Sequence, residues 1–236
     1  MNDVEAFNRS AAEFESALTS NPVIRAVNFH STPRARVAEY REQLAKLSHA
    51  FSPVTEDDLD QYLAAGRWQK PKPGVIISVY EGYRNGFDVM LPLLEEFGLI
   101  GWFFIITGFL KTPPAGQLEY ALSHSIDMAT RDYPDGRYAL SWDELRQLDR
   151  RHVVASHARN HVWIDTLDAA ARESEVVGSQ RDLTEQLGHP VRSFVSYGGP
   201  AYGAYASTDP LIDAAGYQFV FSNMRIQRLR AARSKA

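Results

Sequence analysis

The apolar residues of this chain gather into short runs that alternate with longer segments of mixed polarity. The runs are rich in Val, Ile, Phe and Trp, and their lengths are those of β-strands. Continuous apolar runs of this kind are typical of strands covered on both faces, as in parallel sheets. The predicted strands cover 23–29, 75–80, 100–106, 152–156, 192–196 and 217–221, with a further short strand near Phe51.

Between these runs, apolar residues recur every three or four positions, which predicts amphipathic helices. Thr55 is a good N-cap for one helix, and Ser141 with Glu144 forms a capping box at the start of another. Gly98 and Gly188 stand where two of the helices are expected to end. The predicted helices cover 37–47, 56–65, 87–97, 142–150, 165–187 and 209–215.

Strands that alternate with helices predict a parallel sheet with helices around it. About seven such units indicate an α/β fold, a distorted and incomplete (β/α) barrel. Active sites in barrels of this kind lie at the carboxyl ends of the strands. The segment 107–140 shows little pattern beyond a short helix near 117–128. A loop of that size in a compact domain is more often functional than idle.

The chain divides into three predicted parts. Residues 1–22 form an N-terminal amphipathic helix that caps the domain or meets a partner. Residues 23–222 form the barrel domain, and residues 223–236 form a basic C-terminal tail. The N-terminal helix is predicted from apolar residues that are three or four positions apart: Val4, Phe7, Ala11, Phe14 and Leu18.

Composition narrows the partners and the chemistry. The 236 residues include 25 basic and 29 acidic side chains, a net charge of −4, which gives no electrostatic reason to expect nucleic acid. Cysteine is absent, so neither a disulfide framework nor a thiol nucleophile is expected. The N-terminus lacks the pattern of a signal peptide, and no apolar run reaches the roughly 20 residues that span a bilayer. We therefore expect a soluble, cytoplasmic protein without a membrane partner; a homo-oligomer stays open.

Side chains with metal-binding atoms follow three of the predicted strands. Glu81 comes soon after one strand, and His157 and His161 follow another. His30 ends the first strand. One carboxylate and two imidazoles at strand ends make a three-ligand metal site with open coordination positions. The thermolysin-type pattern H-E-x-x-H is excluded, because Ala158 stands where that pattern has its glutamate.

These segments resemble the polysaccharide deacetylase family of the NodB-homology type, carbohydrate esterase family 4. Residues 78–83 read S-V-Y-E-G-Y, where the first family motif reads T-F-D-D-G-Y. Residues 156–161 read S-H-A-R-N-H, where the second reads S-H-T-x-x-H. Residues 194–200 read F-V-S-Y-G-G-P, a blurred form of the third motif, F-x-Y-P-Y-G. The resemblance runs from about residue 27 to residue 221 and implies the NodB-like (β/α) barrel.

The resemblance also implies a role for each matching position. Glu81, His157 and His161 become the ligands of a divalent metal, zinc first, with cobalt or nickel as alternatives. The family's last motif, a strand that ends in Leu-His, is missing near the C-terminus, whereas the first strand ends in Phe-His. This arrangement resembles the circularly permuted branch typified by biofilm poly-N-acetylglucosamine deacetylases, and it implies that His30 is the general acid. A buried histidine held by the backbone is the alternative for His30.

The general-base position of the family falls on Tyr80, and this departure opens two interpretations. Tyrosine titrates near 10 in peptides and aspartate near 4, so a phenol is a hydrogen-bond donor near neutral pH. In the first interpretation, the protein hydrolyses the acetyl amide or ester of a saccharide or of a small molecule, with Glu81 as ligand or base. In the second, it is a catalytically impaired protein, with or without metal, that binds carbohydrate or serves as a scaffold.

Two further groups of residues have predicted contacts with substrate. Tyr197, Gly198 and Tyr202 lie in the loop of the blurred third motif, where aromatic rings could stack on a sugar. Arg159 and Arg192 lie near the motifs and could contact an anion. Salt-bridged or surface positions are the alternative for both arginines.

Overall fold

The computed structural model describes residues 23–229 of the chain. The predicted N-terminal helix at 1–22 and the last seven residues of the predicted tail lie outside the described residues. Within the described range, one eight-stranded sheet forms the centre of the domain. Its strands are β1 (Ile24–Phe29), β2 (Ser52–Pro53), β3 (Gly74–Val79), β4 (Gly101–Ile105), β5 (Val153–Ser156), β6 (Ser193–Phe194), β7 (Phe219–Phe221) and β8 (Ile226–Arg228).

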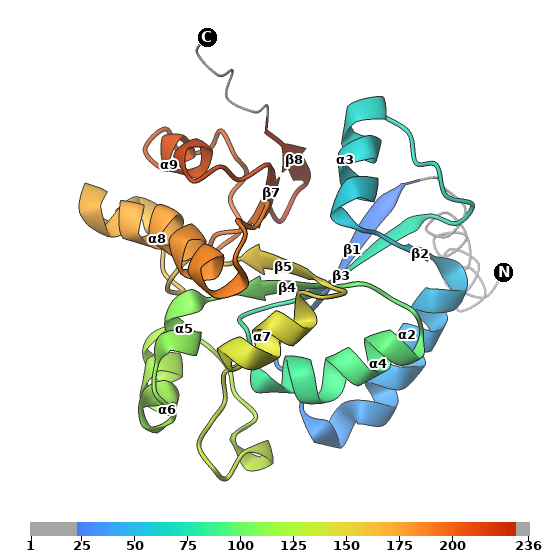
Figure 1. Cartoon of the computed structure of the whole chain (residues 1–236), viewed down its shortest axis with the longest axis horizontal. Helices are drawn as coiled ribbons and strands as arrows, with labels where there is room; N and C mark the ends of the chain where they lie inside the picture. The colour runs from blue at the N-terminus through green and yellow to red at the C-terminus, as the bar shows by residue number, and fades with distance from the viewer. Residues whose placement is uncertain (1–22, 230–236) are drawn as a thin grey trace, which may run out of the picture.

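The strands follow the order β1-β3-β4-β5-β6-β7-β8, and β2 pairs with the first residues of β3. All neighbours are parallel except β7 and β8, which form an antiparallel hairpin. The sheet curls without pairing β1 to β8, and α3 (Glu56–Ala65) lies beside β1, across from the hairpin (Figure 1). The structure confirms the predicted α/β fold, a distorted and incomplete barrel.

Successive side chains along a strand point to opposite faces of the sheet, and because both sets are apolar, both faces are buried. One face belongs to the larger core, with Ile77 and Phe103 packed among residues of the surrounding helices. The other face forms the inside of the half-barrel, where Ile76 and Trp102 pack with Leu59 of α3. Both faces being covered explains why the strands are continuously apolar.

The helices that surround the sheet begin and end largely where the capping signals predict. Thr55 and Ser141 accept hydrogen bonds from backbone N–H groups three residues later, and both complete capping boxes. Gly188 ends α8 in the left-handed conformation, with φ of 81°. The remaining helices are α2 (Val37–Ala50), α4 (Leu91–Glu96), α5 (Thr107–Lys111), α6 (Pro114–Ser123), α7 (Trp142–Leu148), α8 (Ala169–Leu187) and α9 (Asp209–Ala214).

Some predicted elements differ from the structure. The predicted helix 87–97 is divided into a π-helical turn (Gly86–Met90) and α4. The segment 107–140 contains α5 and α6, and α6 begins earlier than predicted because Pro114 suits the first turn of a helix. The predicted helix 165–187 begins only after Asp168, which caps α8. The sheet runs past residue 222, the predicted end of the domain, because β8 follows in what was expected to be a tail.

No helix in residues 23–229 is both long enough and apolar enough to cross a membrane.

Candidate metal centre and catalytic cavity

A cavity of about 300 Å³ opens at the carboxyl ends of the central strands. Its wall includes His30 after β1, Glu81 after β3, and His157 with His161 after β5. In a parallel sheet the crossover connections place the carboxyl ends of all strands at one edge. Because these residues follow apolar strands in the sequence, they were predicted to meet there. The structure thus brings together the four side chains that the sequence singled out for metal binding and proton transfer.

The turn after β3 places Glu81 in the cavity in an unusual backbone conformation. Glu81 has a φ of 67°, a left-handed value that costs a non-glycine residue of order 1 kcal/mol. Gly82 follows with a φ of 83°, and a Cβ atom there would lie 2.8 Å from a methyl group of Leu110. The turn therefore requires glycine at position 82. The side chain of Glu81 is consequently buried, with a relative exposure of 3%.

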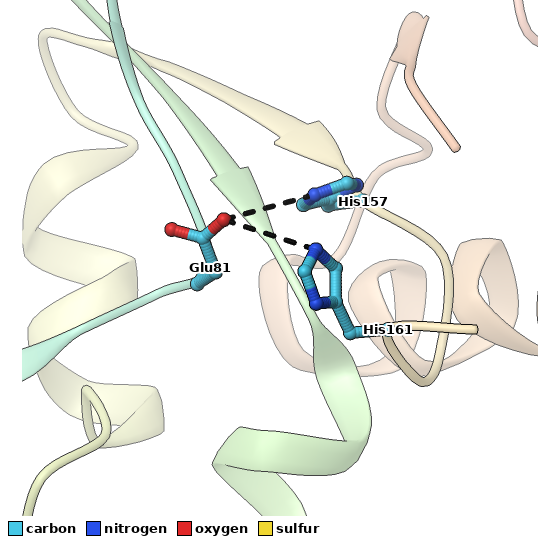
Figure 2. Close-up of side chains that lie close together, drawn as sticks. All are labelled: Glu81, His157 and His161. Carbon is cyan, nitrogen blue, oxygen red and sulfur yellow. Dashed lines mark ion pairs between the residues drawn. The ribbon is translucent and has the colours of Figure 1, made fainter. Parts of the chain in front are cut away.

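The imidazoles of His157 and His161 both turn their Nε2 atoms toward the Glu81 carboxylate (Figure 2). The Nε2 atoms of His157 and His161 each lie 4.0 Å from Oε1 of Glu81. The Nδ1 atoms point the other way, 3.2 Å from the carbonyl oxygen of Val195 and 2.8 Å from that of His124. Because a carbonyl can only accept, Nδ1 carries the proton in both rings and Nε2 keeps its lone pair.

This donor set fits a divalent metal. One ligand atom from each of Glu81, His157 and His161 lies within 4.8 Å of the others. Burial lowers the pKa of His157 to about 3 and also lowers the pKa of His161, so both rings are neutral at physiological pH. Metal binding requires neutral imidazole, and an Nδ1–H donated to a carbonyl is the usual support of a ligating histidine. Two histidines and a carboxylate are a ligand set found around catalytic zinc.

A buried carboxylate of α8 holds the loop between the two histidines. Glu175 accepts the backbone N–H groups of Arg159 and Asn160 at 3.1 and 2.6 Å. It also accepts the side-chain amide of Asn160 at 2.6 Å. The loop turns at Ala158, whose φ is 61°. Three hydrogen bonds to one carboxylate therefore stabilise a strained turn and fix the spacing of His157 and His161.

Asp182, about two turns after Glu175 on α8, fixes the side chain of Arg159. Its two oxygens accept from Nε and Nη2 of Arg159 at 3.0 and 2.9 Å, and Lys111 pairs with the same carboxylate. A Cβ atom at Gly178 would lie 2.6 Å from the guanidinium carbon of Arg159, so glycine there leaves room for this position of the guanidinium. Arg159 is a salt-bridged residue in this structure. Arg192 is salt-bridged too, 3.2 Å from Asp57.

His30 and Tyr80, the predicted general acid and the residue at the predicted base position, lie side by side on the cavity wall. The Nδ1 atom of His30 lies 3.0 and 3.1 Å from the two oxygens of Glu81, and this hydrogen bond raises the pKa of the imidazole. The side chain of His30 is 63% exposed, so the alternative of a buried histidine held by backbone does not describe it. The ring of Tyr80 stacks between His30, at 5.2 Å, and Phe104, at 4.9 Å.

Tyr80 is a neutral phenol in this environment. Burial raises its pKa to about 12, and the charge of Glu81 adds to the effect. This agrees with the expectation that the phenol is a hydrogen-bond donor near neutral pH. A proton acceptor at neutral pH is therefore lacking at the position where the family has its general base.

The predicted substrate-binding residues take different positions. Tyr197 and Gly198 line the cavity, and the ring of Tyr197 lies edge-on to His161 at 4.2 Å. Gly198 is required, because a Cβ atom there would lie 2.3 Å from the ring of Trp163. Tyr202 is absent from the cavity wall, and its hydroxyl donates to Asp213 at 2.8 Å. We therefore leave Tyr202 out of the proposed site.

Sequence reasoning did not select several polar residues of the cavity wall. Asp127 and Ser125 come from the weakly patterned segment 107–140, and the only sequence signal for them was the length of that segment. Asn28 lies two residues before His30 on β1, on the same face of the strand. The cavity residues to which the sequence analysis gave no individual role are Asn28, Tyr83, Ser125, Asp127, Val195, Ser196, Gly199 and Asn223.

Comparisons with known proteins agree on one family. The family model described as polysaccharide deacetylase matches residues 68–220, which is more than half of the chain. A comparison with curated proteins found no match.

Several solved structures share the fold at low sequence identity. The Streptococcus pyogenes deacetylase PplD, solved in complex with acetate, aligns with a TM-score of 0.66 and 13% identity over 88% of each chain. IcaB from Ammonifex degensii aligns with a TM-score of 0.58 and 18% identity over 91% of this chain and 89% of its own. The BpsB deacetylase domain from Bordetella bronchiseptica has a TM-score of 0.58 at 14% identity, over 84% and 86%.

The family match covers both strand ends that carry Glu81 and the histidine pair, and the solved deacetylases share the half-barrel fold. The chain belongs to the polysaccharide deacetylase family.

Proposed function

We propose that this protein is a metal-dependent deacetylase that hydrolyses the acetyl amide or ester of an N- or O-acetylated saccharide. The observation that carries the proposal is the orientation of the two imidazoles. Val195 and His124 hold their Nδ1–H groups, so both Nε2 lone pairs face the buried carboxylate of Glu81. This arrangement supports a metal site better than it supports packing, since neutral histidines inside a core need no shared direction.

In the proposed site, Glu81, His157 and His161 hold the metal. Zinc suits the ligand set best, and cobalt or nickel suit it as well. A bound divalent metal would polarise the acetyl carbonyl and lower the pKa of water. His30 is the general acid, because its raised pKa keeps a proton available for the leaving amine or alcohol. Tyr197, at the cavity wall, is placed to contact the sugar.

The test measures metal content and acetate release together. Protein purified without chelator and loaded with zinc, cobalt or nickel is assayed on acetylated chito-oligosaccharides and on acetyl esters. We expect near-stoichiometric metal and metal-dependent acetate release. A His161→Ala variant, which lacks one ligand, should lose both. A protein that takes up no metal on loading and releases no acetate would overturn the proposal.

A second function is favoured by Tyr80. A phenol with a pKa of about 12 at the general-base position suits a protein that binds carbohydrate in the cavity without cleaving it. The double variant Tyr80→Asp, Glu81→Asp restores the family motif and separates the two functions. Activity that appears only in the double variant supports the binding protein. Activity already present in the wild type supports the deacetylase.

A further inference from the structure

Hydrolysis in this cavity needs a group that accepts a proton from the attacking water. Tyr80 carries a phenol, which ordinarily titrates near 10 and therefore accepts no proton near neutral pH. Its ring is also stacked between His30 and Phe104. Tyr83, which also lines the cavity and is 4% exposed, is a phenol too. Both oxygens of Glu81 contact His30, and the same carboxylate belongs to the metal donor set. The base must therefore come from elsewhere on the cavity wall.

Among the described residues that line the cavity, the acidic side chains are Glu81 and Asp127. Asp127 lies in the connection after α6, three residues beyond His124, whose carbonyl oxygen holds Nδ1 of His161. Ile126, 5% exposed, fixes this connection in the core, and Ser125 turns it with a φ of 55°. The loop that orients a metal ligand thus also brings a carboxylate to the cavity.

The carboxylate of Asp127 has the properties that a base requires. In the described part of the chain no hydrogen bond or ion pair is found for it, and its residue is exposed, so water can reach it. It lines the same cavity as His30 and Glu81. An aspartate side chain is ordinarily ionised at neutral pH and can take up a proton.

We infer that Asp127 is the general base of this deacetylase, in place of the residue that the family carries at position 80. The inference rests on the proposed function. Asp127 accepts one proton from water as the water oxygen bonds to the acetyl carbon. His30 then gives its proton to the leaving nitrogen or oxygen as the bond to the acetyl carbon breaks. Asp127 then passes its proton to solvent and His30 takes one up from solvent, so both groups return to their starting states without a further reactant.

The first experiment compares Asp127→Asn with Glu119→Gln, an exposed carboxylate on α6 outside the cavity, under saturating metal. We expect Asp127→Asn to bind metal like the wild type, because it removes no ligand. We expect its kcat to fall about 100-fold or more, the usual contribution of a general base, while KM stays within about threefold. Glu119→Gln should keep both constants.

The second experiment measures the same substitution in a Tyr80→Asp background. If Tyr80→Asp supplies a base at the family's position, Asp127→Asn should then lower kcat by less than about tenfold. An Asp127 that only supports folding or the charge of His30 would cost the same factor in both backgrounds.

The outcomes separate this inference from the proposed function. A wild type without metal and without acetate release overturns both. An active wild type in which Asp127→Asn keeps its kcat, raises only KM, or loses equally in both backgrounds overturns the inference alone. A kcat loss at full metal content that shrinks in the Tyr80→Asp background supports it.

Discussion

A buried histidine stands at each end of β5, and the two histidines differ in the hydrogen bond that Nδ1 makes. His152, before the strand, accepts the backbone N–H of Gly101 at Nδ1, at 3.1 Å. His157, after the strand, donates Nδ1–H to the carbonyl oxygen of Val195. The proton consequently lies on Nε2 of His152 and on Nδ1 of His157. Burial lowers both pKa values, to about 4 and about 3.

The backbone group that meets the ring therefore decides what each histidine can do. His157 presents a lone pair to Glu81, whereas His152 presents a buried N–H that has no partner among the described residues. Only the first can bind a metal. The opposite ends of the strand agree with the division of labour in barrels, where the carboxyl ends of strands carry chemistry and the amino ends carry stability.

The largest difference between the two histidines is expected in metal binding when each imidazole is removed in turn. We expect His157→Ala to lower metal affinity by more than the roughly 100-fold that loss of a supporting hydrogen bond can cost, because it removes a ligand. The matched variant His152→Asn keeps an acceptor for Gly101 and should retain its metal. Metal content after dialysis, measured by atomic emission, checks both. Equal metal loss in the two variants would contradict the assignment.

The pH dependence of stability tests the other end of the strand. His152 is neutral in the folded protein down to a pH of about 4, whereas the unfolded chain protonates it near 6.5. Between these values the unfolded state binds more protons, so the folded state loses stability as pH falls and is unaffected above 6.5. The contribution amounts to about 3 kcal/mol.

Urea unfolding at pH 7 and at pH 4 measures this contribution. Wild-type protein should lose about 3 kcal/mol more of its unfolding free energy than His152→Asn does. His157 contributes in the same direction in both proteins, so the difference belongs to His152. Parallel pH profiles for the two proteins would show that His152 does not titrate as described.

The loop between His157 and His161, after β5, can be weakened without changing a proposed metal ligand. Glu175→Gln replaces an oxygen that accepts N–H groups by an amide that cannot accept at both positions. We expect a 10- to 100-fold loss of metal affinity and a changed visible spectrum of the cobalt form. Glu173→Gln, an exposed change on the same helix, is the control. Unchanged affinity and spectrum in Glu175→Gln would mean that the loop holds its shape without that carboxylate.

The smallest effect is expected at Tyr80. Tyr80→Phe keeps the ring that stacks on His30 and Phe104 and removes only the hydroxyl. Because the phenol stays protonated near neutral pH, we expect kcat and metal content within about twofold of wild type. A loss near 100-fold in steady-state kinetics would give the hydroxyl a part in proton transfer.

The sequence was informative where local patterns coincide with tertiary structure. Continuous apolar runs predicted β3, β4 and β5, and the positions of Glu81, His157 and His161 after them predicted that these side chains meet. The N-cap at Thr55 and the capping box at Ser141 predicted two helix starts to the residue. In each case the signal lies within a few residues of its consequence.

The remainder depends on contacts between distant segments. β8 is a short strand of exposed or half-exposed residues, and only its pairing with β7 makes it a strand. Tyr202 shares the composition of a sugar-binding loop, but Asp213 of α9 takes its hydroxyl. Asp127 lies in a segment without periodicity, and its place on the cavity wall depends on how Ile126 is buried. No pattern along the chain encodes these three results.

The place of β1 at the edge of the sheet has a consequence for thermal inactivation. β1 pairs with β3 alone among the described strands, whereas β3 and β5 each have neighbours on both sides. Edge elements open at lower free energy than central ones. β1 carries His30, and the central strands lead into Glu81 and His157. On warming, the proposed metal-dependent deacetylase should therefore stop turning over substrate before it releases metal, and cooling should restore turnover without added metal.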